Sequence, residues 1–221
     1  MSDLYSTTPF QSELPSDLNQ PQIPEVPVQT DTLPNGTEVT VYGNWLNDER
    51  FNHLQGKNTY DFQDDCGLVS IQDVLLQHGI NATESDVVSH AVANSECDLA
   101  TSSDSGGETS PMQQAEILND YGLQAQTETN GTLDTLASQV QSGDQVILSV
   151  NAGVLWNESQ YYGNGDYNHA VTVTGVVRDT QTNQVIGFVV NDSGQGKTEL
   201  VDANTMQQAW VNPGGVAVVV G

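Results

Sequence analysis

The hydrophobic pattern of this chain changes character near residue 144. Between residues 67 and 143, apolar residues recur at intervals of three and four, as they do on one face of an α-helix. After residue 144, short β-branched runs bounded by glycine, aspartate and asparagine follow one another, which is typical of strands. Helices followed by strands predict an α+β domain in which an antiparallel sheet covers a helical half.

Apolar spacing and capping residues together predict four helices between residues 67 and 143. Thr83 is followed three residues later by Asp86, a weak relative of the capping box. Ser110 precedes Pro111, and proline is favoured at the first position of a helix. The predicted helices cover residues 67–79, 83–92, 111–122 and 131–143, and residues 101–110 form a polar loop between the second and third.

Strands are predicted mainly in the last third of the chain. Each predicted strand is short, rich in valine, isoleucine or threonine, and bounded by turn-forming residues. The predicted strands cover residues 37–42, 144–153, 169–179, 185–194, 197–202 and 215–221.

The N-terminal segment carries six of the eight prolines without apolar periodicity. Residues 1–35 are therefore predicted to be an extended tail or linker, and residues 36–221 the folded domain. A pro-segment that covers an active site is the alternative interpretation. The first residues have neither a basic nor an apolar region, so no Sec signal peptide is expected. Export would then use a signal-peptide-independent route; otherwise the protein is cytoplasmic.

The net charge of −25 arises because bases are missing. The chain has 29 Asp and Glu residues but only four Lys and Arg residues. Charged residues make up 15% of the chain, below the usual ~25%. A halophilic surface, the alternative explanation, would carry more carboxylates. This balance disfavours nucleic acid and anionic membranes as partners, because no basic patch could offset their charge. It is compatible with a secreted bacterial effector.

Cys66 lies at the start of the first predicted helix, in the segment DFQDDCGLVSIQDVLL. A helix N-terminus stabilises the thiolate, which is the reactive form of cysteine, so Cys66 is either a nucleophile or a small core residue. Cys97 is the second cysteine, expected to be a partly buried structural thiol. A Cys66–Cys97 disulfide would exclude the nucleophile, and the spacing matches no metal-ligand pattern.

A nucleophilic thiol needs a base, and four histidines are available. His78 and His90 are more simply explained as surface or capping residues, and His53 lies in a polar stretch. His169 differs, because it begins a predicted strand after a glycine-rich loop. Asp192 ends the next strand, where a carboxylate could orient the imidazole. The alternative is that Asp192 is only a turn residue.

In these features the chain resembles papain-like cysteine peptidases, particularly the bacteriocin-leader (double-glycine) peptidase branch and papain-fold bacterial toxin domains similar to it. The resemblance implies a papain-like two-lobed α+β domain, with an N-terminal helical lobe and a C-terminal antiparallel sheet. It implies Cys66 as nucleophile, His169 as general base and acid, and Asp192 as the orienting residue, with neither cofactor nor metal ion. It spans roughly residues 60–194, in the segments DDCGLVSIQDVLL, GETSPMQQAEILNDYGLQAQ, GTLDTLASQVQSGDQVILSVNAG, NHAVTVTGVV and FVVNDSG.

One position departs from the pattern of these enzymes. They place an oxyanion-hole glutamine about six residues before the cysteine, where this chain has Tyr60. Gln63 is the nearest glutamine, and a shorter loop would bring its amide beside the Cys66 backbone N–H. Trp156 is expected to line the cleft or to pack in the core. The turn NGDYN (164–168) is too weak a calcium signal to predict a metal site.

These features predict a cysteine-dependent hydrolase that cleaves peptide or isopeptide bonds and acts as a bacterial effector or toxin. Its expected partners are a protein or peptide substrate and, as a candidate, a cognate immunity or inhibitor protein. The same machinery suits a glutamine deamidase or an acyl transferase. A catalytically inactive papain-like binding module and a disulfide-bonded structural domain are the alternatives outside enzymology.

Overall fold

A computed structural model describes residues 26–43, 49–51, 53–99 and 105–221. It combines helices with antiparallel strands, as the sequence pattern predicts. Residues 1–25 of the predicted tail and residues 101–104 of the predicted polar loop lie outside the described residues. Within the described ranges, no helix has the length and apolar content needed to cross a bilayer.

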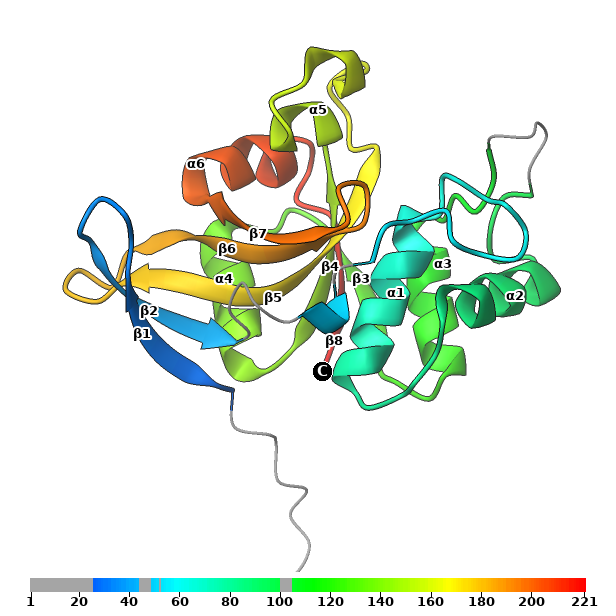
Figure 1. The fold of residues 1–221 in the computed structure, drawn as a ribbon, viewed down its shortest axis with the longest axis horizontal. Helices are drawn as coiled ribbons and strands as arrows, with labels where there is room; N and C mark the ends of the chain where they lie inside the picture. Colours follow the sequence, from blue (N-terminus) through cyan, green and yellow to red (C-terminus); the bar gives the residue numbers. More distant parts are fainter. Residues whose placement is uncertain (1–25, 44–48, 52, 100–104) are drawn as a thin grey trace, which may run out of the picture.

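The described strands form one eight-stranded antiparallel sheet (Figure 1). The pairing runs β1-β2-β5-β4-β8-β3, with β6 on the other edge of β5 and β7 beside β6. The long strand β5 is central because its first half pairs with β4 and its second half with β2. The bounds are β1 (Val28–Thr32), β2 (Glu38–Gly43), β3 (Ala125–Glu128), β4 (Gln145–Val150), β5 (His169–Asp179), β6 (Val185–Asp192), β7 (Lys197–Asp202) and β8 (Ala217–Val220).

The strand β1 lies inside the segment that composition predicts to be a tail. All five of its side chains are exposed, and it is held by backbone pairing with β2. Backbone hydrogen bonds do not depend on side-chain polarity, so an apolar pattern is not needed for such an edge strand. The predicted boundary at residue 35 therefore falls within the β1–β2 hairpin.

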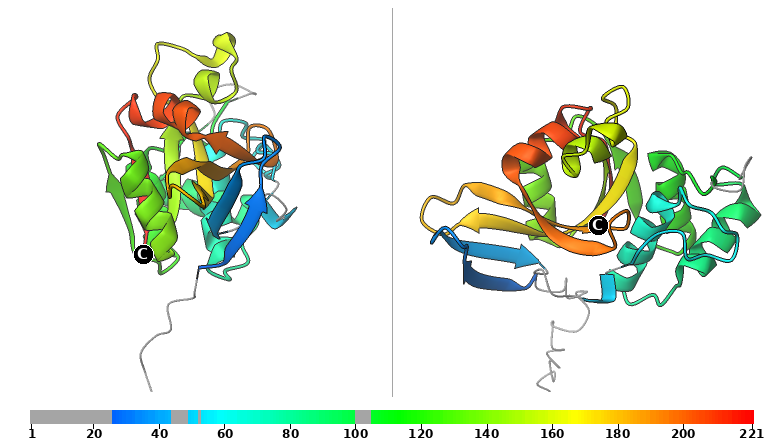
Figure 2. Two further views of the ribbon diagram at one scale, coloured as in Figure 1. Left: turned by 90° about the vertical axis from the view of Figure 1, so that its left-hand side faces the viewer. Right: turned by 45° about the horizontal axis from the view of Figure 1, so that its top comes forward.

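Three helices, α1 (Cys66–Gln77), α2 (Glu84–Asn94) and α3 (Pro111–Asp120), gather on one side of the molecule (Figures 1 and 2). The capping boxes of α2 and α3 confirm the predicted starts, since Thr83 bonds reciprocally with Asp86 and Ser110 with Gln113. Their apolar faces pack against one face of the sheet, through Ile147, Ala170, Val218 and Val220.

The fourth predicted helix corresponds to α4 (Leu133–Ser142), but it does not join the other three. Leu136, Ala137 and Val140 pack against the opposite face of the sheet, with Leu148 and Val171. Strand residues alternate between the two faces of a sheet, so Ile147 and Leu148, neighbours on β4, pack in cores on opposite faces. The expectation that all four helices form one helical half is therefore corrected.

The described chain also contains short elements that the sequence pattern does not predict. They are η1 (Glu49–Phe51), α5 (Ala152–Leu155), η2 (Ser159–Tyr161), α6 (Ala203–Met206) and the π-helical turn η3 (Gln207–Val211). The predicted strand 144–153 ends at Val150 because the Asn151 side chain caps α5, accepting a hydrogen bond from the Val154 N–H (3.0 Å). Elements of three to five residues are too short for periodicity to reveal.

Candidate active site

Cys66 is the first residue of α1 and is partly exposed. Cys97 is buried after the end of α2, and both thiols are free. The structure therefore contains no Cys66–Cys97 disulfide. Burial, with the negative charges of Asp98 and Glu96, raises the pKa of Cys97 and keeps that thiol protonated.

Helix α1 runs against the central strand β5. Thr172 of β5 donates its hydroxyl to the carbonyl oxygen of Ser70 on α1 (3.2 Å), and Ala170 packs in the same core as Leu68 and Ile71. His169 is the first residue of β5. This packing places the start of α1 close to the start of β5, at one end of the central strand.

His169 and Asp192 meet because β5 and β6 are antiparallel neighbours. The first strand begins where the second ends, and the His169 Nε2–Asp192 Oδ1 distance is 2.8 Å. Asp192 Oδ1 also accepts a hydrogen bond from the Gly194 N–H (2.9 Å), and Oδ2 accepts one from the Trp156 indole N–H (2.5 Å). Because Nε2 faces the carboxylate, Nδ1 remains for the thiol of Cys66.

His169 is almost fully buried, and burial opposes its charged form and so lowers its pKa. The hydrogen bonds with Asp192 and Cys66, and the negative charges of both, act in the opposite direction and prevail, raising the pKa of His169 to about 10. The pKa of Asp192 shifts in the opposite direction. Burial raises the pKa of this carboxyl, but the hydrogen bonds from His169, Trp156 and Gly194 have the larger effect, so its pKa is lowered. The arrangement favours a charged imidazole beside a carboxylate.

These side chains line a cavity of ≈ 680 Å³. One wall comes from α1, α3 and the segments before them, and the other from β4, α5, β5 and the loop after η2. The wall beside His169 is aromatic: Trp156 lies 5.1 Å from the His169 ring and meets Tyr161 edge-on at 5.0 Å, measured between ring centroids. Trp156 thus lies in the cleft and also holds Asp192, a contact that its sequence context did not reveal.

Gln63 lines the same cavity, and its amide donates to the carbonyl oxygen of Asp61 (3.3 Å). Three further glutamines, Gln55, Gln114 and Gln195, line it without having been predicted. Gln55 donates to the carbonyl oxygen of Gln63 (2.7 Å) and accepts from the Ser193 hydroxyl (3.1 Å). Gln114, from α3, is buried. Sequence spacing alone could not rank these amides, because loop length decides which one reaches the thiol.

Asp65, directly before the nucleophile candidate, is fully buried. It accepts hydrogen bonds from the Gly56 N–H (3.1 Å) and the Asn58 side chain (3.0 Å). The Asn58 amide also donates to Glu84 (3.1 Å). Burial first, and then its bond with the Glu84 carboxyl and that group's charge, raise the pKa of Asp65 to about 8. Through Asn58, which bonds both carboxyl groups, Asp65 and Glu84 connect the loop before α1 to the start of α2.

The other histidines lie away from this cavity. His78 caps the end of α1, as expected for a capping residue. His53 is ordered by a hydrogen bond to Asp73 of α1 (3.1 Å). His90 belongs to the one group of three metal-ligating side chains within the described ranges, which lies between α2 and α3.

No protein-family model matches the sequence, and no curated protein matches it. Among solved structures, the chain shares the fold of a papain-like cysteine peptidase. One matching crystal structure is described as a candidate C39-like peptidase from Bacillus anthracis. It is similar with a TM-score of 0.57 and 17% sequence identity, over 80% of this chain and 96% of that one. At this identity the likeness establishes the fold.

Proposed function

We propose that this protein is a cysteine-dependent hydrolase that cleaves a peptide or isopeptide bond. Cys66 is the nucleophile, His169 the general base and acid, and Asp192 the residue that orients the imidazole. The observation that carries the proposal is the position of His169, which interacts with Cys66 on one side and with Asp192 on the other. The fold of a C39-like peptidase supports it.

The proposed reaction begins when the Cys66 thiolate attacks the carbonyl carbon and forms a tetrahedral oxyanion. The Cys66 backbone N–H and the Gln63 amide stabilise this oxyanion after the amide leaves its bond to Asp61. The His169 imidazolium donates its proton to the leaving amine, and the C–N bond breaks. Water then attacks the thioester, His169 takes its proton, and the acid product leaves with the thiolate restored.

The electrostatics of the site suit these steps. The raised pKa of His169 keeps the imidazolium available as a proton donor at neutral pH. The lowered pKa of Asp192 keeps its partner charged. Because Asp192 occupies Nε2, the donated proton leaves from Nδ1, which faces the nucleophile.

Three further parts of the proposal concern the arrangement of the domain, its biological role and its branch among papain-like enzymes. We infer a two-lobed arrangement with the cavity between the lobes, supported by the helical and sheet origins of its two walls. An effector or toxin role, exported without a Sec signal peptide and paired with an immunity or inhibitor protein, is supported by the scarcity of bases. The branch that we propose is that of the bacteriocin-leader peptidases and the papain-fold bacterial toxin domains similar to it.

Alkylation with iodoacetamide tests the nucleophile. Cys66 should react about tenfold or more faster than Cys97, whose thiol is buried and protonated. His169→Ala should slow the Cys66 reaction by about 10²-fold. Equal and slow labelling of both thiols would contradict the proposal and favour a catalytically inactive binding module.

Incubation with a proteome separates the reactions that this machinery can perform. A peptidase creates new chain termini, and an isopeptidase releases a branch from lysine. A glutamine deamidase instead adds about one dalton to a substrate, and an acyl transferase adds an acyl group. We expect new termini with the wild type and none with Cys66→Ser.

A further inference from the structure

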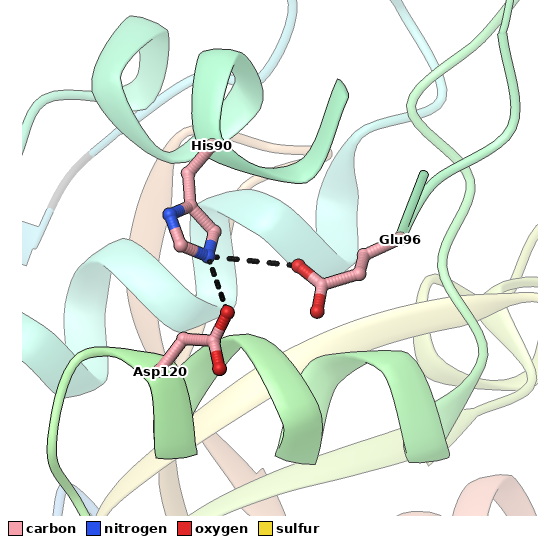
Figure 3. Close-up of side chains that lie close together, drawn as sticks. All are labelled: His90, Glu96 and Asp120. Atoms are coloured by element: carbon pink, nitrogen blue, oxygen red, sulfur yellow. Dashed lines mark hydrogen bonds and ion pairs between the residues drawn. The ribbon is translucent and has the colours of Figure 1, made fainter. Parts of the chain in front are cut away.

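A second group of polar side chains lies at the ends of α2 and α3, away from the proposed active site (Figure 3). His90 belongs to α2, and Asp120 is the last residue of α3. Glu96 follows the end of α2, where Ser95 adopts a left-handed conformation (φ 61°) that turns the chain back. Figure 3 shows both carboxylates directed at the same ring nitrogen of His90.

The spacing of the ligand atoms matches the shell around a small metal ion. His90 Nε2 lies 3.1 Å from Asp120 Oδ2 and 3.6 Å from Glu96 Oε2, and all three atoms lie within 4.8 Å of one another. With metal–ligand bonds of about 2.1 Å, neighbouring ligand atoms are about 3.0–3.4 Å apart. A small ion therefore fits once the Glu96 and Asp120 carboxylates turn toward a common point.

Glu96 provides an independent indication that a ligand is missing. Its side chain is only 14% exposed, and its Oε2 atom is shielded from solvent and has no hydrogen-bond partner in the part of the chain that the structure describes. Buried carboxylate oxygens are normally paired or bound to metal. Asp120 and Glu116 place further negative charge near Glu96. The group thus has more negative charge than one imidazole can balance.

Asn94 offers a fourth donor atom. It lies one helical turn after His90, and its side-chain Nδ2 is 2.9 Å from His90 Nε2 and 3.5 Å from Asp120 Oδ2. The oxygen and nitrogen of an amide group have similar size and shape, so a 180° rotation of the Asn94 side-chain amide places its carbonyl oxygen where Nδ2 now lies. One imidazole nitrogen and three oxygens would then face the same point.

We propose that His90, Glu96 and Asp120, with Asn94 as the fourth ligand, bind one divalent transition-metal ion such as Zn²⁺ or Mn²⁺. A mixed nitrogen and carboxylate set suits these ions better than Ca²⁺, which takes six to eight oxygen ligands. The ion can enter from solvent, since the side chains of His90 and Asp120 are 27% and 49% exposed. It ties the end of α2 to the end of α3, and both helices share a core with α1, the helix that begins at Cys66. This proposal is independent of the proposed hydrolase activity.

Metal titration of the full chain tests the site. The experiment uses EDTA-treated protein with Cys66→Ser, which removes the thiol that could also bind Zn²⁺. Calorimetry with ZnCl₂ and MnCl₂ should detect one saturable ion per chain. At about 100 times the dissociation constant, the ion should raise the unfolding temperature by about 5 °C or more.

Near-isosteric variants then locate the bound ion. In the same background, Glu96→Gln and His90→Gln should each weaken binding at least about tenfold. Asp134→Asn, an exposed acidic residue on α4, serves as the control and should leave the affinity unchanged. Absence of saturable binding of both ions to the parent protein would overturn the proposal. Equal affinity of the parent and both ligand variants would also overturn it, because the ion would then bind elsewhere.

Discussion

The indole N–H of Trp156 donates a hydrogen bond to Asp192 Oδ2 at 2.5 Å. The other oxygen of the same carboxylate bonds His169 and the Gly194 N–H, so both oxygens are held. The carboxylate cannot rotate away from the imidazole without breaking these contacts. Trp156 is therefore a positioning residue for the proposed catalytic pair.

Trp156→Phe should weaken this hold, because it removes the indole donor and keeps an aromatic ring. We expect Cys66 alkylation to slow by about three- to tenfold and the free energy of unfolding to fall by about 1–3 kcal/mol. The control is Trp210→Phe, which removes a similar buried N–H bond to the Val216 carbonyl oxygen, distant from the cavity. It should lower stability and leave the alkylation rate unchanged; an equal rate loss in both variants would refute the positioning role.

The titration of His169 should depend on both of its partners. In the wild type, the imidazole should lose its proton near pH 10, because Asp192 and Cys66 raise its pKa. Asp192→Asn removes one negative charge and should move this titration to lower pH. NMR of histidine-labelled protein, with His169→Gln for assignment, measures the shift directly. The stabilising contribution of this group should be complete below about pH 6.5 and lost as the pH rises through about 10. An unchanged titration in Asp192→Asn would contradict the assigned orienting role.

Gly194→Ala should disturb the site sterically. A Cβ atom there would lie 2.7 Å from the Trp156 ring and 3.2 Å from His169 Cε1, so one of these rings must move. We expect Cys66 alkylation to slow by about tenfold or more. Gly221→Ala is the control, since its added Cβ would have no neighbour nearer than 3.8 Å. A wild-type rate in the Gly194 variant would show that Cys66 alkylation does not depend on the present positions of the Trp156 and His169 rings.

Asp65 should make folding stability depend on pH. Its pKa is about 8 in the folded protein and near 3.8 for an ordinary carboxyl, so the folded state binds the proton more tightly. The contribution is therefore present at low pH and lost as the pH rises from about 4 to about 8, amounting to a few kcal/mol at most.

Asp65→Asn should flatten this part of the stability curve. Urea unfolding at pH 4 to 8 measures the slope for the wild type, the variant and the exposed-residue control Asp134→Asn. The control should keep the wild-type slope. A variant that kept it as well would show that Asp65 does not lose its proton between pH 4 and pH 8.

Local signals in the sequence were sufficient for several elements of the fold. Ser110 and Thr83 specify helix starts through hydrogen bonds to residues three positions away. The strand at 169–179 was predicted with its observed bounds, because within residues 171–177 only Gly175 interrupts its β-branched run. By contrast β3, with the sequence AQTE, has no apolar pattern and exists because β8 lies beside it.

The residue types of the candidate site and the pairing of His169 with Asp192 were also foreseeable, but its other long-range contacts were not. A cysteine at a helix start and a histidine at a strand start are local features. Trp156 and Asp192 are 36 positions apart, and His90 and Asp120 are 30. No periodicity links such pairs, so their contacts depend on how helices and strands pack. Which glutamine lies by the thiol depends likewise on the path of one loop.

The sequence by itself determined where α2, α3 and β5 begin, because caps and alternation act over a few residues. It also determined that a thiol would stand at a helix start and an imidazole at a strand start. The tertiary structure decided that α4 lies on the opposite face from α1, that Trp156 holds Asp192, and that α2 and α3 bring His90 and Asp120 together. These contacts join distant segments, and burial of apolar surface, which has no preferred direction along the chain, selects among them.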